Sequence, residues 1–357
     1  MIPLLNFDIH KIKYVAFLPF FCFLWSGCID EIKLDIDTDQ QMIVVNGLVS
    51  DSLQVHKVQI GYSAVIGVGN DNILTPIEGA TVLVKDDAGG VYQYAEVGKG
   101  FYEKEFKGEP GRVYHIEVEL PDGKRIHSTP ALLHEAPKLG EASFEVVEEV
   151  YLSPTGNELK NKFLQVNLST DVGSLTERPY LLWRTTGEYE FWEGGGFTIN
   201  PRVCYVKNNV DLNVIKVLDT RKMAGSQITN EPFLRTAFNY RFSDKYCFHL
   251  QQYAINETEY KYWKAVDAII HIDGNMFDPP PGTVKGNLFN LGDSSEKVFG
   301  YFTVAGVSYR RAFMNAESIG SIVIRKCESL SNNGYSPDCA YCLSIPNSTA
   351  SKPSYWP

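Results

Sequence analysis

Short stretches in which hydrophobic and polar residues alternate follow one another from about residue 40 to residue 130. The stretches 42–49 and 113–120 are typical, and Pro121-Asp122-Gly123-Lys124 ends the second with a proline that presets φ and a glycine that accepts positive φ. Strands repeated about every 8–12 residues with such turns predict a small β-sandwich. We expect an immunoglobulin-like or carboxypeptidase-regulatory-like β-sandwich over residues 40–130.

Beyond a proline-bounded linker, a larger β-rich domain is predicted over residues 137–357. Within it, hydrophobic residues such as Phe248 alternate with Cys247 and His249, which assigns the two sets to opposite faces of one strand. The expected strands of this region are 142–151, 163–168, 180–191, 202–206, 240–255, 299–313 and 321–325.

One segment of this region has a helical period. Asn256 stands where an N-cap is expected, with Glu259 three positions later, and Tyr260, Trp263 and Ile270 recur on one face of a helix predicted for residues 256–270. The predicted fold class is therefore mainly all-β. It comprises the N-terminal sandwich, the linker, and a larger sandwich or partial barrel with one helix packed on it.

The first 27 residues have the pattern of a signal peptide. Lys11 and Lys13 precede an apolar run over 14–25, which is shorter than the roughly 20 residues of a transmembrane helix and is typical of a secretory signal. Ser26-Gly27 before Cys28 resembles a bacterial lipobox. We expect cleavage after residue 27 and attachment of acyl chains such as palmitate to Cys28. Ordinary secretory cleavage is the alternative, because a bulky tryptophan stands where a lipobox prefers a small aliphatic residue.

Acidic residues follow the expected lipidation site, with Asp35, Asp37 and Asp39 at alternate positions of the segment 28–39. A run of this kind resembles the surface-export signal of Bacteroidota lipoproteins. It would equally serve as a solvated tether that holds the folded part away from the bilayer. The two interpretations are compatible.

Composition narrows the function classes further. Hydrophobic residues make up 44% of the chain and charged residues 21%, which excludes a disordered protein. The mean hydropathy of −0.16 excludes a polytopic membrane protein. With 43 acidic against 33 basic residues, the net charge of −10 disfavours a nucleic-acid partner.

Five cysteines remain after removal of the signal and lipidation of Cys28, and they are Cys204, Cys247, Cys327, Cys339 and Cys342. A secreted protein folds in an oxidising compartment, so disulfides are expected, and the odd number leaves at least one thiol unpaired or bonded to a partner protein. We expect Cys204 to pair with Cys247 and Cys327 to pair with Cys339 or Cys342. A zinc site lacks a second ligand pair nearby, and a redox CxxC belongs to a βαβ turn rather than to an irregular tail.

The sequence contains no recognisable catalytic motif. Its histidines form no close ligand pair, and neither G-x-S-x-G nor G-x-x-x-x-G-K-[ST] occurs. We therefore expect no catalytic residues, no metal and no cofactor. A catalytic site assembled from residues distant in the sequence is the open alternative.

A glycine-rich loop is the strongest candidate for ligand or partner binding. Trp192 and Phe197 flank Gly194, Gly195 and Gly196, so the loop could close on a ligand and stack its aromatic side chains against it. The alternative is a hairpin turn whose aromatic residues point into the core.

Two shorter motifs also stand out. Asp51-Ser52-Leu53 resembles an O-glycosylation site of secreted Bacteroidota proteins, with Ser52 as the acceptor. The segment 277–282 contains three consecutive prolines, which make a stiff connector suited to a rim or a docking surface.

An ordered series of motifs resembles a known family. The series is Glu259-Tyr260-x-Tyr262-Trp263, Lys285-Gly286-Asn287, Gly300-Tyr301-Phe302, Arg310-Arg311, Cys339-x-x-Cys342 and Pro353-x-x-Trp356. It resembles domain of unknown function 4249, a family of Bacteroidota outer-membrane lipoproteins, over essentially the whole mature chain. The chain departs from the family pattern in having little glycine after the last CxxC. The family name assigns no activity, so no catalytic residue can be carried over.

The resemblance implies a cellular setting. Such lipoproteins are similar in setting to the partners of TonB-dependent transporters, so we expect an outer-membrane, lipid-anchored and surface-exposed protein without enzymatic activity. It would capture a glycan or other nutrient ligand, or cover the mouth of the transporter. An adhesin or envelope-structural lipoprotein is the alternative, and a hydrolase with a concealed site is the third interpretation.

Overall fold

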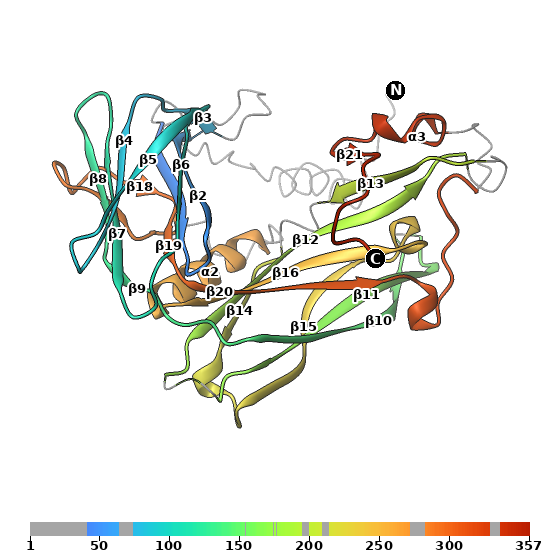
Figure 1. Ribbon diagram of the computed structural model, residues 1–357. Coiled ribbons are helices and arrows are strands. Elements are labelled where there is room, and N and C mark those ends of the chain that lie inside the picture. Colours follow the sequence, from blue (N-terminus) through green and yellow to red (C-terminus); the bar gives the residue numbers. More distant parts are fainter. Residues whose placement is uncertain are drawn as a thin grey trace, which may run out of the picture. The chain divides into compact units, whose positions relative to one another are not determined.

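Strands from two distant parts of the chain build the first sheet (Figure 1). The computed structural model of the protein describes residues 41–63, 74–153, 155–173, 175, 177–194, 200–208, 214–271, 283–328 and 336–357. Residues 41–357 form one compact unit. The expected signal peptide (1–27), the acidic tether (28–39) and the proline run (277–282) therefore lie outside the described residues.

Twelve strands of the described residues form this first sheet. They are β1 (Ile43–Val49), β2 (Gln54–Ser63), β3 (Leu74–Pro76), β4 (Thr81–Asp86), β5 (Val91–Gly98), β6 (Phe101–Phe106), β7 (Val113–Glu119), β8 (Arg125–Ser128), β9 (Ala131–Leu132), β17 (Leu288–Asn290), β18 (Val298–Phe299) and β19 (Phe302–Val304). The strand order is β17-β8-β7-β4-β5-β6-β2-β1-β18, with β19, β3 and β9 added beside β1, β2 and β7. Alternate residues such as Tyr114, Ile116 and Val118 are buried in a core enclosed by this sheet, as the strand pattern predicted.

The strands at the two ends of this sheet, β17 and β18, come from one stretch of the chain. The side chain of Asn287 holds this stretch together. Asn287 donates from Nδ2 to the carbonyl oxygen of Phe302 (2.8 Å) and accepts the Phe302 N–H at Oδ1 (2.9 Å). Its side chain therefore forms the two hydrogen bonds with the Phe302 backbone that a neighbouring strand would otherwise form. Glycine is required at the neighbouring crossing, because Gly300 has a φ of +91° and a Cβ there would lie 2.1 Å from the carbonyl oxygen of Val45. A Cβ on Gly286 would lie 1.9 Å from the carbonyl oxygen of Gly300. Two of the motifs that carry the family resemblance therefore close this sheet.

Replacing Asn287 with alanine should test this closure. The Asn287→Ala variant leaves the buried N–H and C=O groups of Phe302 without their partners, and we expect the free energy of unfolding to fall by about 2 kcal/mol. Urea denaturation would measure the loss. Asn161→Ala, at an exposed position, serves as the control and should change stability by less than about 0.5 kcal/mol. An equally small effect of Asn287→Ala would contradict the bridging role.

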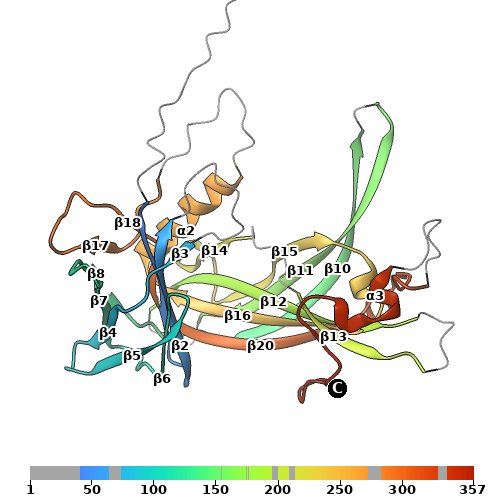
Figure 2. The ribbon, with the colours of Figure 1, turned by 90° about the horizontal axis from the view of Figure 1, so that it is seen from above.

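Two further sheets pack face to face as a sandwich. The three-stranded sheet has the order β10-β11-β15, and the six-stranded sheet has the order β20-β16-β12-β13-β21, with β14 beside β12. The strands are β10 (Leu139–Leu152), β11 (Glu158–Asp171), β12 (Tyr180–Trp192), β13 (Val203–Asn208), β14 (Lys216–Asp219), β15 (Gln227–Ala237), β16 (Tyr246–Ile255), β20 (Gly306–Met314) and β21 (Ser348–Thr349). Their shared core contains Leu164, Trp183 and Phe248, all without exposed surface. Seen from above, the β10–β11 hairpin extends beyond the rest of its sheet (Figure 2).

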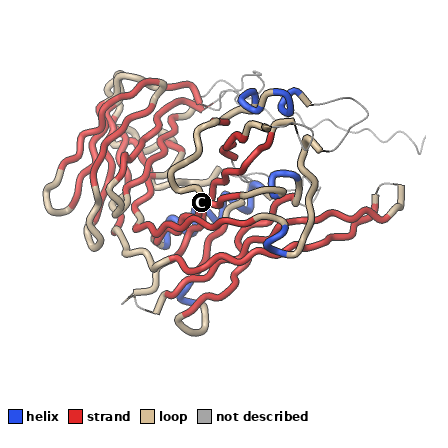
Figure 3. The backbone as a smooth tube through the Cα atoms, turned by 45° about the vertical axis from the view of Figure 1, so that its right-hand side comes forward, coloured by secondary structure: helices blue, strands red, loops and turns tan. Residues whose placement is uncertain are grey.

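Helices are few in the described residues, as Figure 3 shows. The longest is α2 (Glu257–Ile270), which confirms the predicted helix. The shorter helices are η3 (Thr220–Lys222), η4 (Tyr240–Phe242), η5 (Glu317–Ile319), α3 (Pro337–Ala340) and η6 (Cys342–Ser344). No helix in the described part of the chain is long and apolar enough to cross a membrane. The predicted fold class, mainly β with one packed helix, is confirmed.

The structure differs from the sequence prediction at particular elements. The strand expected over 321–325 is wrong: Ile322 and Ile324 are 92% and 64% exposed, and Arg325 instead forms an ion pair with Asp244. The strand β15 was not anticipated. In addition, residues 288–304 were predicted to belong to the larger domain beyond the linker, but they pair with strands of the first sheet. This pairing is possible because one edge of β1 is otherwise unpaired.

Candidate functional site

The six-stranded sheet turns alternate residues away from the sandwich core, and these form its outer face. The register pairs Tyr180 with Ile255 and Glu188 with Cys247, so even positions of β12 and odd positions of β16 share this face. Strand β20 adds residues such as Arg311, which lies beside position 249. One end of the face is apolar and lies against α2, and the other end lies against residues 355 and 356. The polar stretch between these two ends is the candidate site.

Helix α2 is placed over the apolar end by its first turn. Asn256 is the N-cap and accepts the N–H of Glu259 at 2.8 Å, as predicted. Tyr260 stacks on Tyr180 with ring centroids 4.5 Å apart, and Tyr262 packs on Tyr301 at 4.7 Å. The helix therefore joins the six-stranded sheet to the β18–β19 crossing of the first sheet.

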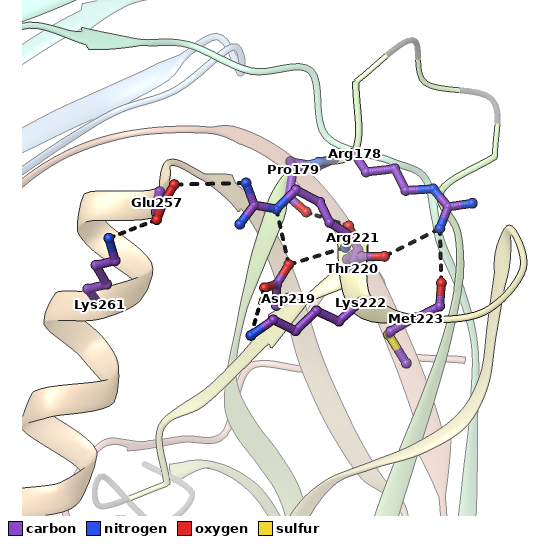
Figure 4. Close-up of polar contacts among 9 residues, drawn as sticks. All are labelled: Arg178, Pro179, Asp219, Thr220, Arg221, Lys222, Met223, Glu257 and Lys261. Atoms are coloured by element: carbon purple, nitrogen blue, oxygen red, sulfur yellow. Dashed lines mark hydrogen bonds and ion pairs between the residues drawn. The ribbon is translucent and has the colours of Figure 1, made fainter.

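A charged cluster fixes the beginning of α2 against the end of β14 (Figure 4). Arg221 lies between two carboxylates, with Asp219 Oδ1 at 3.2 Å from its Nε and Glu257 Oε2 at 3.8 Å from its Nη1. The same guanidinium covers the Tyr180 ring at 4.0 Å, and Glu257 also pairs with Lys261 at 2.7 Å. This cluster positions the helix, and because both of its carboxylates are engaged in ion pairs within it, it is not itself a candidate ligand site.

A cavity of about 460 Å³ lies where the first sheet, β12, β16 and α2 meet. Its lining residues are Asn46, Gly47, Leu48, Lys57, Gln59, Phe101, Leu182, Arg184, Tyr253, Trp263, Tyr301 and Thr303. Four aromatic rings and two cationic side chains among them combine a stacking surface with hydrogen-bond donors, a combination typical of small-molecule sites. The Arg184 guanidinium covers the Trp263 ring at 4.6 Å. Both residues also line a second cavity of about 460 Å³ beside α2.

Glu259 is buried at the wall of the first cavity. Its Oε1 accepts hydrogen bonds from Thr303 Oγ1 (2.5 Å) and Trp263 Nε1 (3.1 Å), and its Oε2 is buried with no partner in the described residues. Burial raises the pKa of Glu259 to about 7, although those two hydrogen bonds and the charge of Arg184 act in the opposite direction. The carboxyl group is therefore near its midpoint at neutral pH, and its buried Oε2 remains without a hydrogen-bond partner in the described residues.

A second polar cluster occupies the far end of the outer face. Glu188 is 1% exposed, accepts a hydrogen bond from the Tyr355 hydroxyl, and lies 3.6 Å from Nε2 of His249. His249 Nδ1 is 2.5 Å from the Tyr309 hydroxyl. Burial lowers the pKa of His249, and the charge of Arg311 adds to this effect while Glu188 opposes it. The imidazole is therefore held mainly neutral at pH 7.

Residues 355 and 356 shield this cluster from solvent. Trp356 packs edge-on against Tyr205 and Phe313, and its Nε1 donates to Glu190 at 2.6 Å. Cys247 lies beneath these rings without exposed surface. Burial raises the pKa of its thiol to about 12, so the sulfur stays protonated and unreactive.

The disulfides differ in part from the prediction. The expected Cys204–Cys247 bond is wrong, because Cys204 bonds to Cys342 and Cys247 is a free thiol. The register explains the difference: Cys204 pairs with Phe191, on the core face, whereas Cys247 lies on the outer face. Cys327 bonds to Cys339, one of the two partners expected for it.

The predicted binding loop is only partly described. Trp192 is half-buried at the end of β12, beneath the Arg325 guanidinium at 4.8 Å. Gly194 has a φ of +69° and donates its N–H to the carbonyl oxygen of Cys339. Gly195, Gly196 and Phe197 lie outside the described residues, as does Cys28. Ser52 is half-buried in a turn whose Asp51 accepts the N–H of Val307, and its glycosylation stays a prediction.

Sequence reasoning did not anticipate several residues of the site. Arg184 and Glu188 interrupt an otherwise apolar strand at even positions, and this signal could have marked one face of β12 as polar. Glu259 was recognised only as a helix-capping residue, but its side chain turns inward to Trp263 rather than back to the N-cap. The motif containing Glu259, Tyr260, Tyr262 and Trp263 did mark this place in the fold.

Comparison with known proteins identifies one family. The family model described as a domain of unknown function (DUF4249) matches residues 29–311, which include α2, the first cavity and Arg311. No curated protein matches the chain.

Proposed function

Because the chain belongs to the domain of unknown function family DUF4249, we propose its role from its own residues: it is a lipid-anchored outer-membrane protein that captures a nutrient ligand beside a TonB-dependent transporter. Cys28 provides the anchor, and the acidic segment 28–39 serves as tether and export signal. The folded part works outside the cell as a binding module. A glycan is the ligand class that the aromatic lining of the site fits best.

The observation that carries this proposal is the cavity beside α2. A space of about 460 Å³, lined by Phe101, Tyr253, Trp263 and Tyr301 together with the donor group of Arg184, is suited to hold a small ligand or one end of a larger one. Its walls come from different sheets joined by close backbone contacts, so the binding surface is preformed. A preformed surface loses little conformational entropy on binding.

The chemistry of the outer face supports binding rather than catalysis. The free thiol on this face, Cys247, is protonated and covered, so it is a poor nucleophile. Glu188 accepts a hydrogen bond from Tyr355, and His249 is hydrogen-bonded to Tyr309. Both side chains are thus engaged by neighbouring tyrosines, although Glu188 Oε1 has no hydrogen-bond partner in the described residues, and we propose that the protein is not an enzyme.

Co-purification tests the role directly. We expect the full-length protein, tagged and solubilised with detergent from outer membranes, to be recovered together with a TonB-dependent transporter. A Cys28→Ser variant is the control: without acyl chains it should remain in the soluble fraction and be recovered without the transporter. Repeated recovery of the lipidated protein on its own would overturn the proposed partnership.

A further inference from the structure

Three cationic side chains project from the outer face of the six-stranded sheet, in a chain with a net charge of −10. Arg184 on β12, Lys207 on β13 and Arg311 on β20 are all exposed. We call them the cationic strip. Within the described residues, none of the three lies within ion-pair distance of a carboxylate, although many exposed cations elsewhere in the chain do, such as Arg310 with Glu141.

Two carboxylates on the same face of the sheet are engaged by residues 355 and 356. Glu188 is buried and accepts a hydrogen bond from the Tyr355 hydroxyl, and the half-buried Glu190 accepts one from the indole N–H of Trp356. These two carboxylates are therefore less accessible than the three exposed cationic side chains. The outward charge of this face is opposite in sign to that of the whole protein, so it attracts anions locally.

Aromatic rings hold the two guanidinium groups in place. Arg184 covers Trp263 at 4.6 Å, and Arg311 covers Tyr355 at 4.1 Å and Tyr309 at 5.2 Å. A guanidinium stacked on a ring keeps its N–H edges free, and these edges match a carboxylate in a two-bond geometry. Tyr309 is 45% exposed and offers part of its ring to the apolar face of a sugar.

The spacing of the arginines indicates a ligand with more than one acidic group. Strands β12 and β20 lie on opposite sides of β16, so their backbones are about 10 Å apart. Arg184 stacks on Trp263 and Arg311 stacks on Tyr355, so the two guanidinium groups are directed to separate rings and are better matched by two carboxylates than by one. The polar side chains Thr186 and Gln251 lie between them on the same face and provide further hydrogen-bonding groups.

We propose that the cationic strip binds an acidic oligosaccharide, with Arg184 and Arg311 contacting the carboxylates of different uronic-acid units and Lys207 adding attraction. This inference rests on the proposed role in ligand capture and specifies the ligand class. A sugar acid fits better than a polyphosphate, because it combines carboxylates with apolar ring faces that can stack on the exposed part of the Tyr309 ring.

Calorimetric titration of the full-length protein in detergent with an oligogalacturonate of defined length tests the proposal. We expect saturable binding that weakens as salt is raised, and no binding of a neutral galacto-oligosaccharide of the same length. Arg184→Gln and Arg311→Gln should each weaken binding on the order of tenfold, since each removes charge-assisted hydrogen bonds.

The chain offers a matched control for the arginine variants. Arg310 neighbours Arg311 on β20 but lies on the other face, where it pairs with Glu141 at 3.1 Å. Arg310→Gln should leave the affinity unchanged, and thermal unfolding of all variants would show that each one folds. An equal loss with Arg310→Gln would overturn the proposal, as would equal affinity for the neutral sugar or for a single-stranded DNA oligomer. Because transporter co-purification is measured separately, failure of sugar binding alone would refute the ligand class and leave the proposed partnership standing.

Discussion

Replacing both Cys204 and Cys342 with alanine should lower the free energy of unfolding by about 5 kcal/mol, because the disulfide closes a very long loop and constrains the unfolded chain. The two residues are separated by 138 positions. The bond also ties β13, at one side of the six-stranded sheet, to the turn formed by η6. Denaturant unfolding at neutral pH, with the loss calculated from the midpoint and slope, is the measurement.

The second disulfide serves as an internal control for this prediction. Cys327 and Cys339 are only 12 positions apart, so their double alanine variant should lose about 3 kcal/mol. Changing the free Cys247 to serine would place a hydroxyl under Tyr355 and Trp356 without breaking any covalent link. Equal losses for the two disulfide variants would show that loop length does not govern their contribution.

Replacing Glu259 with glutamine should remove a pH dependence of stability. The folded protein holds the pKa of Glu259 at about 7 against an ordinary value of 4.5. The folded state therefore binds this proton more tightly than the unfolded state, and the free energy of unfolding should fall as pH rises from 4.5 to 7. The expected fall is about 3 kcal/mol, with no further loss from this group at higher pH.

The Glu259→Gln variant should show no such fall, since the amide stays neutral and can still accept hydrogen bonds from Thr303 and Trp263. The neighbouring tyrosines Tyr253, Tyr262 and Tyr301 do not titrate in this range, because burial raises their pKa values. Glu257→Gln, in the same first turn but exposed, is the control and should keep the wild-type slope. A slope that persists in Glu259→Gln would assign the pH dependence to another group.

Much of the fold could be predicted from local pattern. Strands such as β7 alternate between buried and partly buried residues, because one face packs on a core and the other is nearer to water. Helix α2 carries its own start signal at Asn256 and a hydrophobic stripe. These features depend on a few neighbouring residues, so one sequence is enough to reveal them.

Elements that depend on distant partners could not be predicted in the same way. Strand β15 contains Pro232, which argues against a strand, but β15 is an edge strand and its pairing with β11 shifts register around that residue. The segment 321–325 shows the reverse case, since Ile322 and Ile324 alternate as in a strand but have no partner strand. The Cys204–Cys342 bond likewise follows from the face of β13 on which Cys204 lies.

The candidate site was only partly visible for the same reason. The motif around Trp263 marked the right helix, and Arg310-Arg311 marked the right strand. However, the burial of Glu259 and the shielding of Glu188 by Tyr355 arise only when segments about 40 to 170 positions apart are brought together. Binding sites formed at such junctions leave no compact motif in the sequence.

Strands β17, β18 and β19 lie far along the chain from β1 but belong to the same sheet, and this order has a consequence for biogenesis. Synthesis from the N-terminus delivers β1 early and residues 288–304 much later, so the open edge of β1 stays unpaired while most of the chain is still being made. Exposed strand edges recruit other chains into aggregates. We therefore expect the emerging protein to depend on a holding chaperone until residue 304 has been released, and a fragment ending near residue 137 to be insoluble.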